Sequence, residues 1–274
     1  MPEELKYKPR GMATEKPYIV IMDKLDIAIE DANQEAARLG WKEIPECQSV
    51  LLQYRSRKGC SFELLRGNSL SKLVAVEHGL LFQIELGRHQ NSGLFLDMRN
   101  GRDWVRNNAL NKKVLNLFAY TCAFSVAALA GGADQVVNFD TSKVALAKGR
   151  ENHRLNQQNT QQVIFEGVDI FKSFSRIKKH GPYDLLICDP PSYQKGSVDI
   201  KRDYKKIVSR IPLFMKKNSL ILLCLNSPEL GDDFLTELVS VQCPACQFVM
   251  KINPPAIFKD AIAGRGLKVH IYRF

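Results

Sequence analysis

Strand-like and helix-like segments alternate from residue 113 to the end of the chain, and this rhythm limits the fold more than any other feature. Continuous apolar strands are expected at 114–118, 135–139, 163–165, 183–188 and 220–225. Helical patterns lie between several of them, at 124–130, 142–156 and 204–214. Strands that are apolar along their whole length are buried on both faces, so the alternation indicates a parallel sheet covered by helices on both sides. We therefore predict a doubly wound, Rossmann-like α/β fold, with two further strands at the sheet edge, at 248–252 and 268–272.

A smaller α+β region precedes this sheet. A helix is expected at 24–39, where apolar residues recur at helical spacing and Gly40 can cap the end. Short apolar segments separated by turn residues follow, at 49–54, 61–65, 73–76 and 80–86. We therefore expect two domains, an N-terminal α+β region over residues 1–86 and the sheet domain over residues 87–274.

The charge of the chain favours a polyanionic partner. The formal net charge is +10 and the isoelectric point is about 9.2. Lys and Arg side chains that neutralise phosphates supply most of the sequence-independent affinity for nucleic acids. Basic residues gather at 55–58 and at 201–217, where seven Lys and Arg accompany a single acid, Asp203. Each run taken alone is more typical of a solvated surface, so charge supports other evidence but does not replace it.

Several classes of protein are disfavoured by the composition. No apolar run is long enough to span a bilayer, and the first 20 residues do not resemble a signal peptide, so a cytoplasmic protein is expected. Seven scattered cysteines indicate reduced, buried thiols. Cys243 and Cys246 have the spacing of metal ligands, but a zinc site needs four ligands and no second pair accompanies them. We therefore predict no metal and no membrane association.

Acidic residues follow three of the expected strands, namely Asp140, Asp169 and Asp189. In doubly wound sheets, ligands bind beyond the carboxyl ends of the strands, near the point where the strand order reverses. The alternative for any single acid is a helix N-cap, since Asp140 and Asp169 both precede helical stretches. Three acids at three strand ends together indicate a ligand site.

The first strand is followed by a loop that contains no glycine. Between Lys112 and Ala130 the chain has neither the glycine pattern of dinucleotide-binding proteins nor a P-loop, so a phosphate-rich ligand is disfavoured. A nucleoside without phosphates remains, in which Asp140 would accept hydrogen bonds from the ribose hydroxyls and Asp169 from the adenine amino group. S-adenosylmethionine is the common ligand of that kind.

The tetrapeptide Asp-Pro-Pro-Ser at 189–192 is the sharpest local motif. Its two prolines stiffen the loop and leave the carbonyl of Pro190 free to accept a hydrogen bond from the amino group of a base. Tyr193 follows and offers a ring for base stacking. The alternative is an ordinary proline-rich loop between a strand and a helix.

Four segments carry a family resemblance, at 90–99, 116–121, 136–142 and 189–193. In order and spacing they resemble the bacterial 23S ribosomal RNA methyltransferases, in the branch of cytosine-C5 and guanine-N7 enzymes of the large subunit. The likeness runs from about Arg55 to Phe274. It implies S-adenosylmethionine as cofactor and 23S rRNA as partner.

The resemblance also implies site residues. In the family, the segment that corresponds to 93–99 lies over the cofactor cleft, although Phe95 could equally be a core residue. The residues expected around the cofactor are Phe95, Arg99, Asn116, Phe118, Ala119, Tyr120, Thr121, Asp140, Thr141, Ser142, Asp169, Ile170, Phe171 and Asp189. The residues expected to position the base are Asp189, Pro190, Pro191 and Tyr193.

Two departures bear on the activity. Cys122 stands where the family usually has glycine, which puts the fit of the cofactor in question and leaves open a module that binds RNA without turnover. Cytosine-C5 members use a cysteine at the end of the fifth strand, because ring carbon five becomes nucleophilic only after a thiolate adds to carbon six. Here Asn226 takes that place, and Cys224 lies two residues earlier on the same strand face.

The region at 55–59 looks more like the insertion that precedes the core of the guanine-N7 enzymes. Transfer to a ring nitrogen needs chiefly that the enzyme hold the nitrogen in line with the methyl group. The favoured function is therefore guanine-N7 methylation of 23S rRNA. The alternatives are a cytosine-C5 rRNA methyltransferase and a protein or small-molecule methyltransferase.

Overall fold

The structure is a computed structural model in which the described residues are 7–9, 18–24, 47–56, 59–67, 73–86, 91–191, 193–194, 198–256 and 266–274. The chain divides into two compact units, Met1–Leu94 and Phe95–Phe274, and each is described by itself. The division follows Leu94, whereas the sequence-based expectation placed a boundary after residue 86. Among the described residues, no helix is long and apolar enough to cross a membrane.

The described part of the first unit is built of short strands. They are β1 (Tyr7–Pro9), β2 (Tyr18–Lys24), β3 (Cys47–Ser56), β4 (Gly59–Arg66), β5 (Leu73–Glu77) and β6 (Leu80–Ile84). The first sheet has the order β2-β3-β4 and the second has the order β1-β5-β6. His78 and Gly79 have φ of 48° and 79° and form the tight turn between β5 and β6, since such two-residue turns need positive φ. The four strands expected between residues 49 and 86 are confirmed. Of the helix expected at 24–39, only residue 24 belongs to the described residues.

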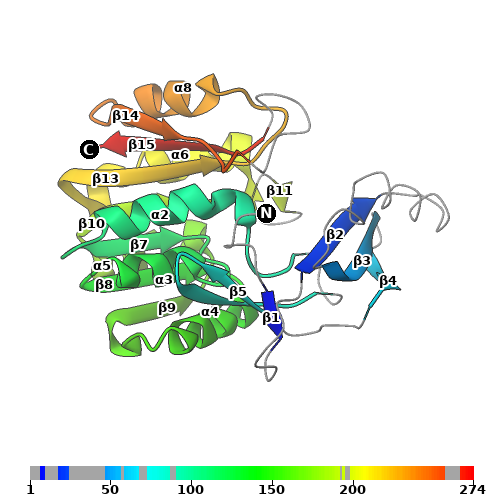
Figure 1. The fold of residues 1–274 in the computed structure, drawn as a ribbon. Helices are drawn as coiled ribbons and strands as arrows, with labels where there is room; N and C mark the ends of the chain where they lie inside the picture. Colours follow the sequence, from blue (N-terminus) through cyan, green and yellow to red (C-terminus); the bar gives the residue numbers. More distant parts are fainter. Residues whose placement is uncertain are drawn as a thin grey trace. The chain divides into compact units, whose positions relative to one another are not determined.

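The second unit contains a sheet with the order β14-β15-β13-β10-β7-β8-β9 (Figure 1). Its strands are β7 (Lys113–Leu117), β8 (Gln135–Asp140), β9 (Val163–Gly167), β10 (Tyr183–Cys188), β13 (Met215–Leu225), β14 (Gln247–Ile252) and β15 (Lys268–Arg273). Strands β13, β10, β7, β8 and β9 run parallel, and β15 and β14 continue the sheet with antiparallel pairing. The predicted doubly wound α/β fold is confirmed.

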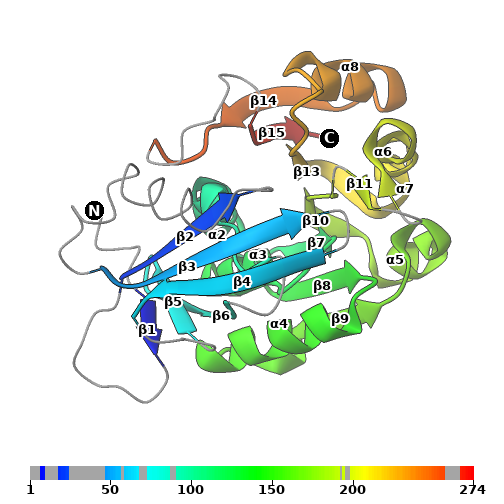
Figure 2. The ribbon, with the colours of Figure 1, turned by 90° about the vertical axis from the view of Figure 1, so that its right-hand side faces the viewer.

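Helices cover both faces of this sheet. They are α2 (Arg99–Asn108), α3 (Ala123–Ala130), α4 (Lys143–Leu155), α5 (Phe174–His180), α6 (Ile200–Val208), α7 (Ile211–Phe214) and α8 (Asp233–Gln242). Short elements complete the unit, namely the 3-10 helices η3 (Leu96–Met98), η4 (Thr160–Gln162) and η5 (Ile170–Lys172) and the hairpin β11 (Tyr193–Gln194) and β12 (Val198–Asp199). Apolar residues of α2 and α3 pack with one face, and those of α5, α6, α7 and α8 pack with the other, where Figure 2 shows these four helices together.

The helix expected at 204–214 is interrupted. Helix α6 already begins at Ile200, because Asp199 caps it by accepting hydrogen bonds from the backbone N–H groups of Lys201 (3.0 Å) and Arg202 (3.3 Å). It ends at Val208, and α7 starts afresh with Pro212 in its first turn. Proline lacks the N–H that would continue the ladder of hydrogen bonds and tolerates only the first turn of a helix, so a single helix cannot run through this point.

The strand order reverses between β7 and β10. The chain places β7, β8 and β9 successively outward and then returns to the other side of β7 with β10. Ligands of such sheets bind in the crevice outside the carboxyl ends of the strands at this point. Two loops meet this condition, the one after β7 at 118–122 and the one after β10 that begins at Asp189.

Candidate active site

The loop after β7 has a strained backbone. Phe118, Tyr120 and Cys122 have φ of 58°, 48° and 60°, in the left-handed region. In this region the conformation of a residue with a side chain is about 1–2 kcal/mol less stable, and such strained residues cluster at functional sites. Hydrogen bonds hold the loop, from the N–H of Ala119 to the carbonyl of Phe139 (3.0 Å) and from the N–H of Cys122 to the carbonyl of Ala119 (2.7 Å). The protein's own hydrogen bonds therefore hold the backbone in this shape.

Asp140 ties this loop to the end of β8. Its Oδ2 accepts a hydrogen bond from the N–H of Tyr120 (2.8 Å), and its Oδ1 accepts one from the N–H of Ser142 (2.7 Å). The cap of α4 is Ser142, whose Oγ accepts from the N–H of Ala145 (3.1 Å), so the N-cap interpretation is wrong for Asp140. Burial raises the pKa of Asp140, and the two N–H groups oppose the rise. Each carboxylate oxygen keeps acceptor capacity for a further donor, beside the exposed Thr141.

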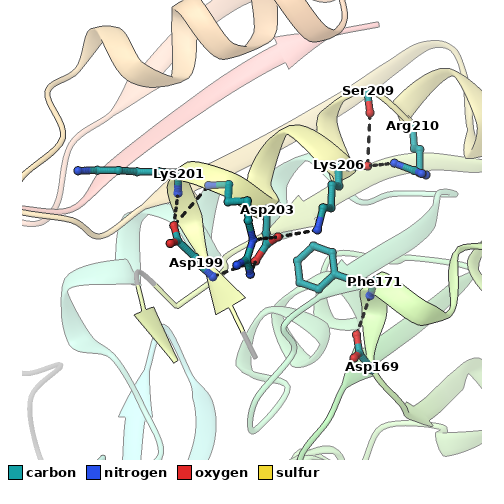
Figure 3. Close-up of polar contacts among 9 residues, drawn as sticks. Asp169, Phe171, Asp199, Lys201, Asp203, Lys206, Ser209 and Arg210 are labelled. Atoms are coloured by element: carbon teal, nitrogen blue, oxygen red, sulfur yellow. Dashed lines mark hydrogen bonds and ion pairs between the residues drawn. The ribbon is translucent and has the colours of Figure 1, made fainter. Parts of the chain in front are cut away.

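Asp169 is the N-cap of η5. Its Oδ1 accepts a hydrogen bond from the N–H of Phe171 (2.9 Å; Figure 3), so the N-cap interpretation is correct for this acid. The side chain is nevertheless 38% exposed and can meet a ligand as well. The half-buried ring of Phe171 lies 6.1 Å from that of Phe118, measured between centroids. Ile170, between Asp169 and Phe171 in the sequence, is buried in the core, so its side chain cannot line a ligand site.

Two further aromatic residues meet beside the same loop. The ring of Phe95 is 5.8 Å from that of Tyr120 between centroids, with a tilt of 52°. Phe95 is 44% exposed, so the alternative that it is a core residue is wrong. Arg99 begins α2 four residues later and is half-buried.

Asp189 directly follows β10 and carries the most telling ionisation in the site. Burial raises its pKa to about 7, and the charge of Asp97 on η3 adds to the rise. The charge of Arg102 on α2 and a hydrogen bond from the thiol of Cys224 oppose it. A carboxyl group with this pKa is close to half-ionised near neutral pH, and such shifted pKa values cluster at functional sites.

The rest of the Asp-Pro-Pro-Ser-Tyr motif is seen in part. Pro190 is buried and Pro191 is exposed. Tyr193 begins the hairpin strand β11, but its side chain lies outside what the structure describes, as does Ser192. The side chains of the basic run at 55–58 are likewise not described, since Arg57 and Lys58 and the side chain of Arg55 lie outside the described residues.

Cys224 is fully buried one residue before the end of β13. Its thiol hydrogen-bonds to Asp189, and its carbonyl accepts a hydrogen bond from the hydroxyl of Tyr204 (2.9 Å). Burial and the nearby charge of Asp189 raise the pKa of the thiol well above its usual value. A thiol that stays protonated is a poor nucleophile. Asn226, which follows the strand, is exposed.

Asn116 belongs to a buried polar chain that links strands to helices. Its Nδ2 donates to Oδ1 of Asn138 (2.8 Å), and Nδ2 of Asn138 donates to Oγ of Ser125 (3.0 Å). Oγ of Ser125 lies 3.0 Å from Nε2 of His153, whose pKa burial lowers to about 4. The imidazole is therefore neutral, and its Nε2 accepts a hydrogen bond from the hydroxyl of Ser125. The side chain of Asn116 thus holds β7, β8, α3 and α4 together beneath the site.

Cys122 is accommodated by a glycine on α4. Its side chain is fully buried, in a cluster with Ala119 and Leu146. A Cβ atom added at Gly149 would lie 2.4 Å from Sγ of Cys122, so the thiol fills the space that Gly149 leaves. The carbonyl of the buried Thr121 accepts a hydrogen bond from the side chain of Asn152 (2.9 Å). The loop therefore keeps its shape with cysteine at this position.

The sequence-predicted site is thus partly assembled. Strand ends bring together the loop at 118–122, Asp140, Asp169, Phe171 and Asp189, whereas the side chains of Asn116 and Ile170 lie in the interior. Asp97 and Arg102, which act on the ionisation of Asp189, were not predicted from the sequence. The position of Asp97 inside the 93–99 segment was the available signal. Among the described residues, no group of three or more His, Cys, Asp or Glu side chains is arranged to hold a metal ion.

Comparisons with known proteins point to one family. A family model described as S-adenosylmethionine-dependent methyltransferase matches residues 26–273. The ribosomal RNA large subunit methyltransferase K of Neisseria meningitidis serogroup B is 30% identical over 220 residues, which cover 78% of this chain and 61% of that protein. The ribosomal RNA large subunit methyltransferase I of Serratia proteamaculans is 35% identical over 139 residues, which cover 49% of this chain and 35% of that protein. This chain thus spans less than two thirds of the length of these relatives.

A solved structure shows the same fold. The crystal structure of SMU.776 in complex with S-adenosylhomocysteine superposes with a TM-score of 0.84, at 23% identity. The match covers 93% of this chain and 69% of that one.

Proposed function

Because this chain belongs to the S-adenosylmethionine-dependent methyltransferases, we propose that it methylates a base of 23S rRNA, with N7 of a guanine as the acceptor. The RNA part of the proposal is supported by the relative from Neisseria, which is named for the large ribosomal subunit and matches 78% of this chain. The choice of a ring nitrogen rests on one observation, the full burial of Cys224.

The residues at the strand ends fit this cofactor. When bound, S-adenosylmethionine supplies a methyl group that its sulfonium already activates. In our proposal the free acceptor positions of Asp140 take the ribose hydroxyls, and Asp169 takes the adenine amino group beside the rings of Phe118 and Phe171. The backbone of the strained loop at 118–122 would hold the methionine part. This division of labour explains why the chain needs no glycine-rich phosphate loop.

The remaining residues of the predicted cofactor site have supporting parts in this proposal. Phe95 contacts Tyr120 of the loop, and Thr141 and Ser142 follow Asp140, so these four residues are proposed to border the cofactor. Arg99, four residues after Phe95, is proposed to border it as well. Asn116, Ala119, Thr121 and Ile170 are buried, so they hold the shape of the pocket.

Base positioning falls to the loop after β10. Methylation of guanine N7 moves a positive charge from the sulfur to the base, and a carboxylate beside the base stabilises that charge. Asp189 is the acid at the required strand end, and its pKa of about 7 lets it be ionised at neutral pH. Pro190 and Pro191 stiffen the backbone next to it, and Tyr193 is proposed to stack on the base.

Cytosine-C5 methylation would need a thiolate at the end of β13. Cys224 lies at that end but is fully buried, and its proton is retained because burial raises its pKa. The exposed residue at the strand end is Asn226, whose amide cannot add to a pyrimidine ring. These facts favour a ring nitrogen, which carries its own lone pair and needs no covalent intermediate.

The direct test is a map of modified nucleosides in 23S rRNA from a strain that lacks the protein. We expect the loss of one 7-methylguanosine, its return with the wild-type protein and no return with Asp189→Ala. Loss of a 5-methylcytidine would support the cytosine alternative. Unchanged rRNA would support a protein or small-molecule substrate.

A further inference from the structure

The exposed face of helix α6 carries only cations. Four of its nine residues are exposed, and these are Lys201, Arg202, Lys205 and Lys206. The single acid of the helix, Asp203, is on the buried face with its apolar residues. Seen from solvent, this helix is therefore an uninterrupted basic surface.

The helix that carries this basic surface is anchored beside the proposed base-binding loop. The hydroxyl of Tyr204 on α6 lies 3.3 Å from the carbonyl of Cys188 and 2.9 Å from that of Cys224, at the carboxyl ends of β10 and β13. Cys188 is the residue directly before Asp189. The anchor therefore fixes α6 at the edge of the sheet where the base is proposed to bind.

A buried carboxylate holds two of the cations in place (Figure 3). Asp203 has a side chain that is 2% exposed, and it accepts hydrogen bonds from Nε (2.9 Å) and Nη2 (2.7 Å) of Arg202 and from Nζ of Lys206 (2.7 Å). The guanidinium of Arg202 and the other donors hold the pKa of Asp203 well below its usual range. Arg202 still exposes 63% of its side chain, so it can bind an anion while remaining oriented. Orientation before binding lowers the entropy lost on binding.

The cations continue toward the proposed adenine site. Nζ of Lys206 lies 5.7 Å from the ring centroid of Phe171, and the guanidinium of Arg210 lies 4.4 Å from that of Phe174. Phe171 is also the residue whose N–H is bound by Asp169. The basic surface thus runs from the base-binding loop to the edge of the cofactor site.

The rest of the basic run at 201–217 lies elsewhere. Lys216 and Lys217 are exposed at the start of β13, at the opposite end of that strand from Cys224. A strand rises about 3.3 Å per residue, so Lys217 is roughly 20 Å or more from Cys224. The sequence run therefore forms two separate surfaces, one beside the site and one remote from it.

We propose that the exposed face of α6 binds the phosphates of the RNA strand whose base enters the site, with Lys201, Arg202 and Lys205 as the contacts. This inference rests on the proposed function. Lys201 has a carboxylate partner, Glu229 (3.3 Å), but both side chains are largely exposed, and such a pair exchanges readily for a phosphate. A repeated phosphate backbone suits a helix whose cations recur along one face, and the net charge of +10 favours the same partner.

The test compares two double variants of the full-length protein, Lys201→Ala/Lys205→Ala and Lys216→Ala/Lys217→Ala. Each removes two charges and one surface ion pair, because Lys216 pairs with Asp184 (2.8 Å) as Lys201 does with Glu229. Filter binding to an unmodified 23S rRNA transcript would be measured from about 50 to 300 mM KCl. The slope of log affinity against log salt is negative, and the loss of two phosphate contacts on a single strand should reduce its magnitude by about 1.4 in the α6 variant. The remote variant should keep the wild-type slope.

Each outcome decides a different question. An equal reduction of the salt dependence in both variants would mean that net charge and not α6 controls binding, and would overturn the inference. If the wild-type protein methylates the transcript but the α6 variant keeps the wild-type slope, the assignment of this surface is overturned and the proposed function stands. A wild-type protein that neither binds nor methylates the transcript would overturn both. Calorimetry with S-adenosylhomocysteine should give one affinity for all three proteins, which shows that the fold is intact.

Discussion

The two loops at the reversal of strand order are built in different ways. The loop after β7 has three residues with side chains in the left-handed region and is held by backbone hydrogen bonds and by Asp140. The loop after β10 begins with two prolines and a carboxyl group whose ionisation is set by burial and by Asp97. The first loop is therefore defined by its backbone shape, and the second by the charge of its carboxyl group. We infer that the cofactor side is rigid before binding, whereas the acceptor side is controlled by the protonation of Asp189.

Removing the charge of Asp189 should reduce methyl transfer more than any other change proposed for the site. Asp189→Asn keeps the size of the side chain but removes its charge, so the cation formed on the base loses its stabilising partner. Removal of one such electrostatic group typically costs about 100-fold or more in turnover. Single-turnover methyl transfer to 23S rRNA at saturating cofactor measures it, and a rate near that of the wild type would contradict the role of Asp189.

The next effect breaks the cofactor side. Asp140→Ala removes the carboxylate that holds Tyr120 and is proposed to hold the ribose. The loss of charge-assisted hydrogen bonds should weaken the binding of S-adenosylhomocysteine by about 1.5–3 kcal/mol, measured by calorimetry. Asp134→Ala is the matched control, since this exposed acid lies just before the other end of β8. Equal affinities for the two variants would contradict the ribose assignment.

The pH dependence of methyl transfer tests the protonation of Asp189. Because burial raises the pKa of Asp189 to about 7, the carboxyl group is mostly protonated at pH 6 and mostly ionised at pH 8. If the ionised form acts on the base, kcat/KM for RNA should rise about tenfold between these values, since this ratio reports the free enzyme. The Asp189→Asn variant should show no such rise. A wild-type profile that is flat or falls would contradict the assignment.

A packing test isolates the shape of the cofactor loop. Gly149→Ala forces a Cβ atom to within 2.4 Å of the thiol of Cys122, so we expect a loss of about 1–3 kcal/mol in the free energy of unfolding. Cys122→Gly in the same chain should restore most of it, because the thiol no longer occupies the space. Gly231→Ala is the control, since an added Cβ there meets nothing within 4 Å. Additive effects of the two changes in denaturant unfolding would show that the contact does not matter.

The sequence predicted the sheet well and the contacts across it poorly. Continuous apolar runs bounded by polar residues predict a strand from local information, so β10 was placed at its observed limits. Helix α2 was not expected, because its residues are mostly polar and it even buries Arg102. The space for Cys122 depends on Gly149, and the pKa of Asp189 depends on Asp97. Both relations arise only when distant segments meet, so a single sequence without the fold cannot reveal them.

The smallest expected effect concerns Cys224. Cys224→Ser should keep most of the methyl-transfer activity, because a hydroxyl can still donate a hydrogen bond to Asp189 and the buried thiol is not the nucleophile. Asn226→Ala, at the exposed strand end, is a useful companion variant. Complete loss of activity in the serine variant would be evidence for covalent catalysis.

The most direct test of the account is the identity of the methylated nucleoside. The purified protein would be incubated with labelled S-adenosylmethionine and an unmodified 23S rRNA transcript, and the digested product would be separated by liquid chromatography and mass spectrometry. We predict labelled 7-methylguanosine and no covalent complex with RNA that contains 5-fluorocytosine. Labelled 5-methylcytidine together with such a complex would contradict it.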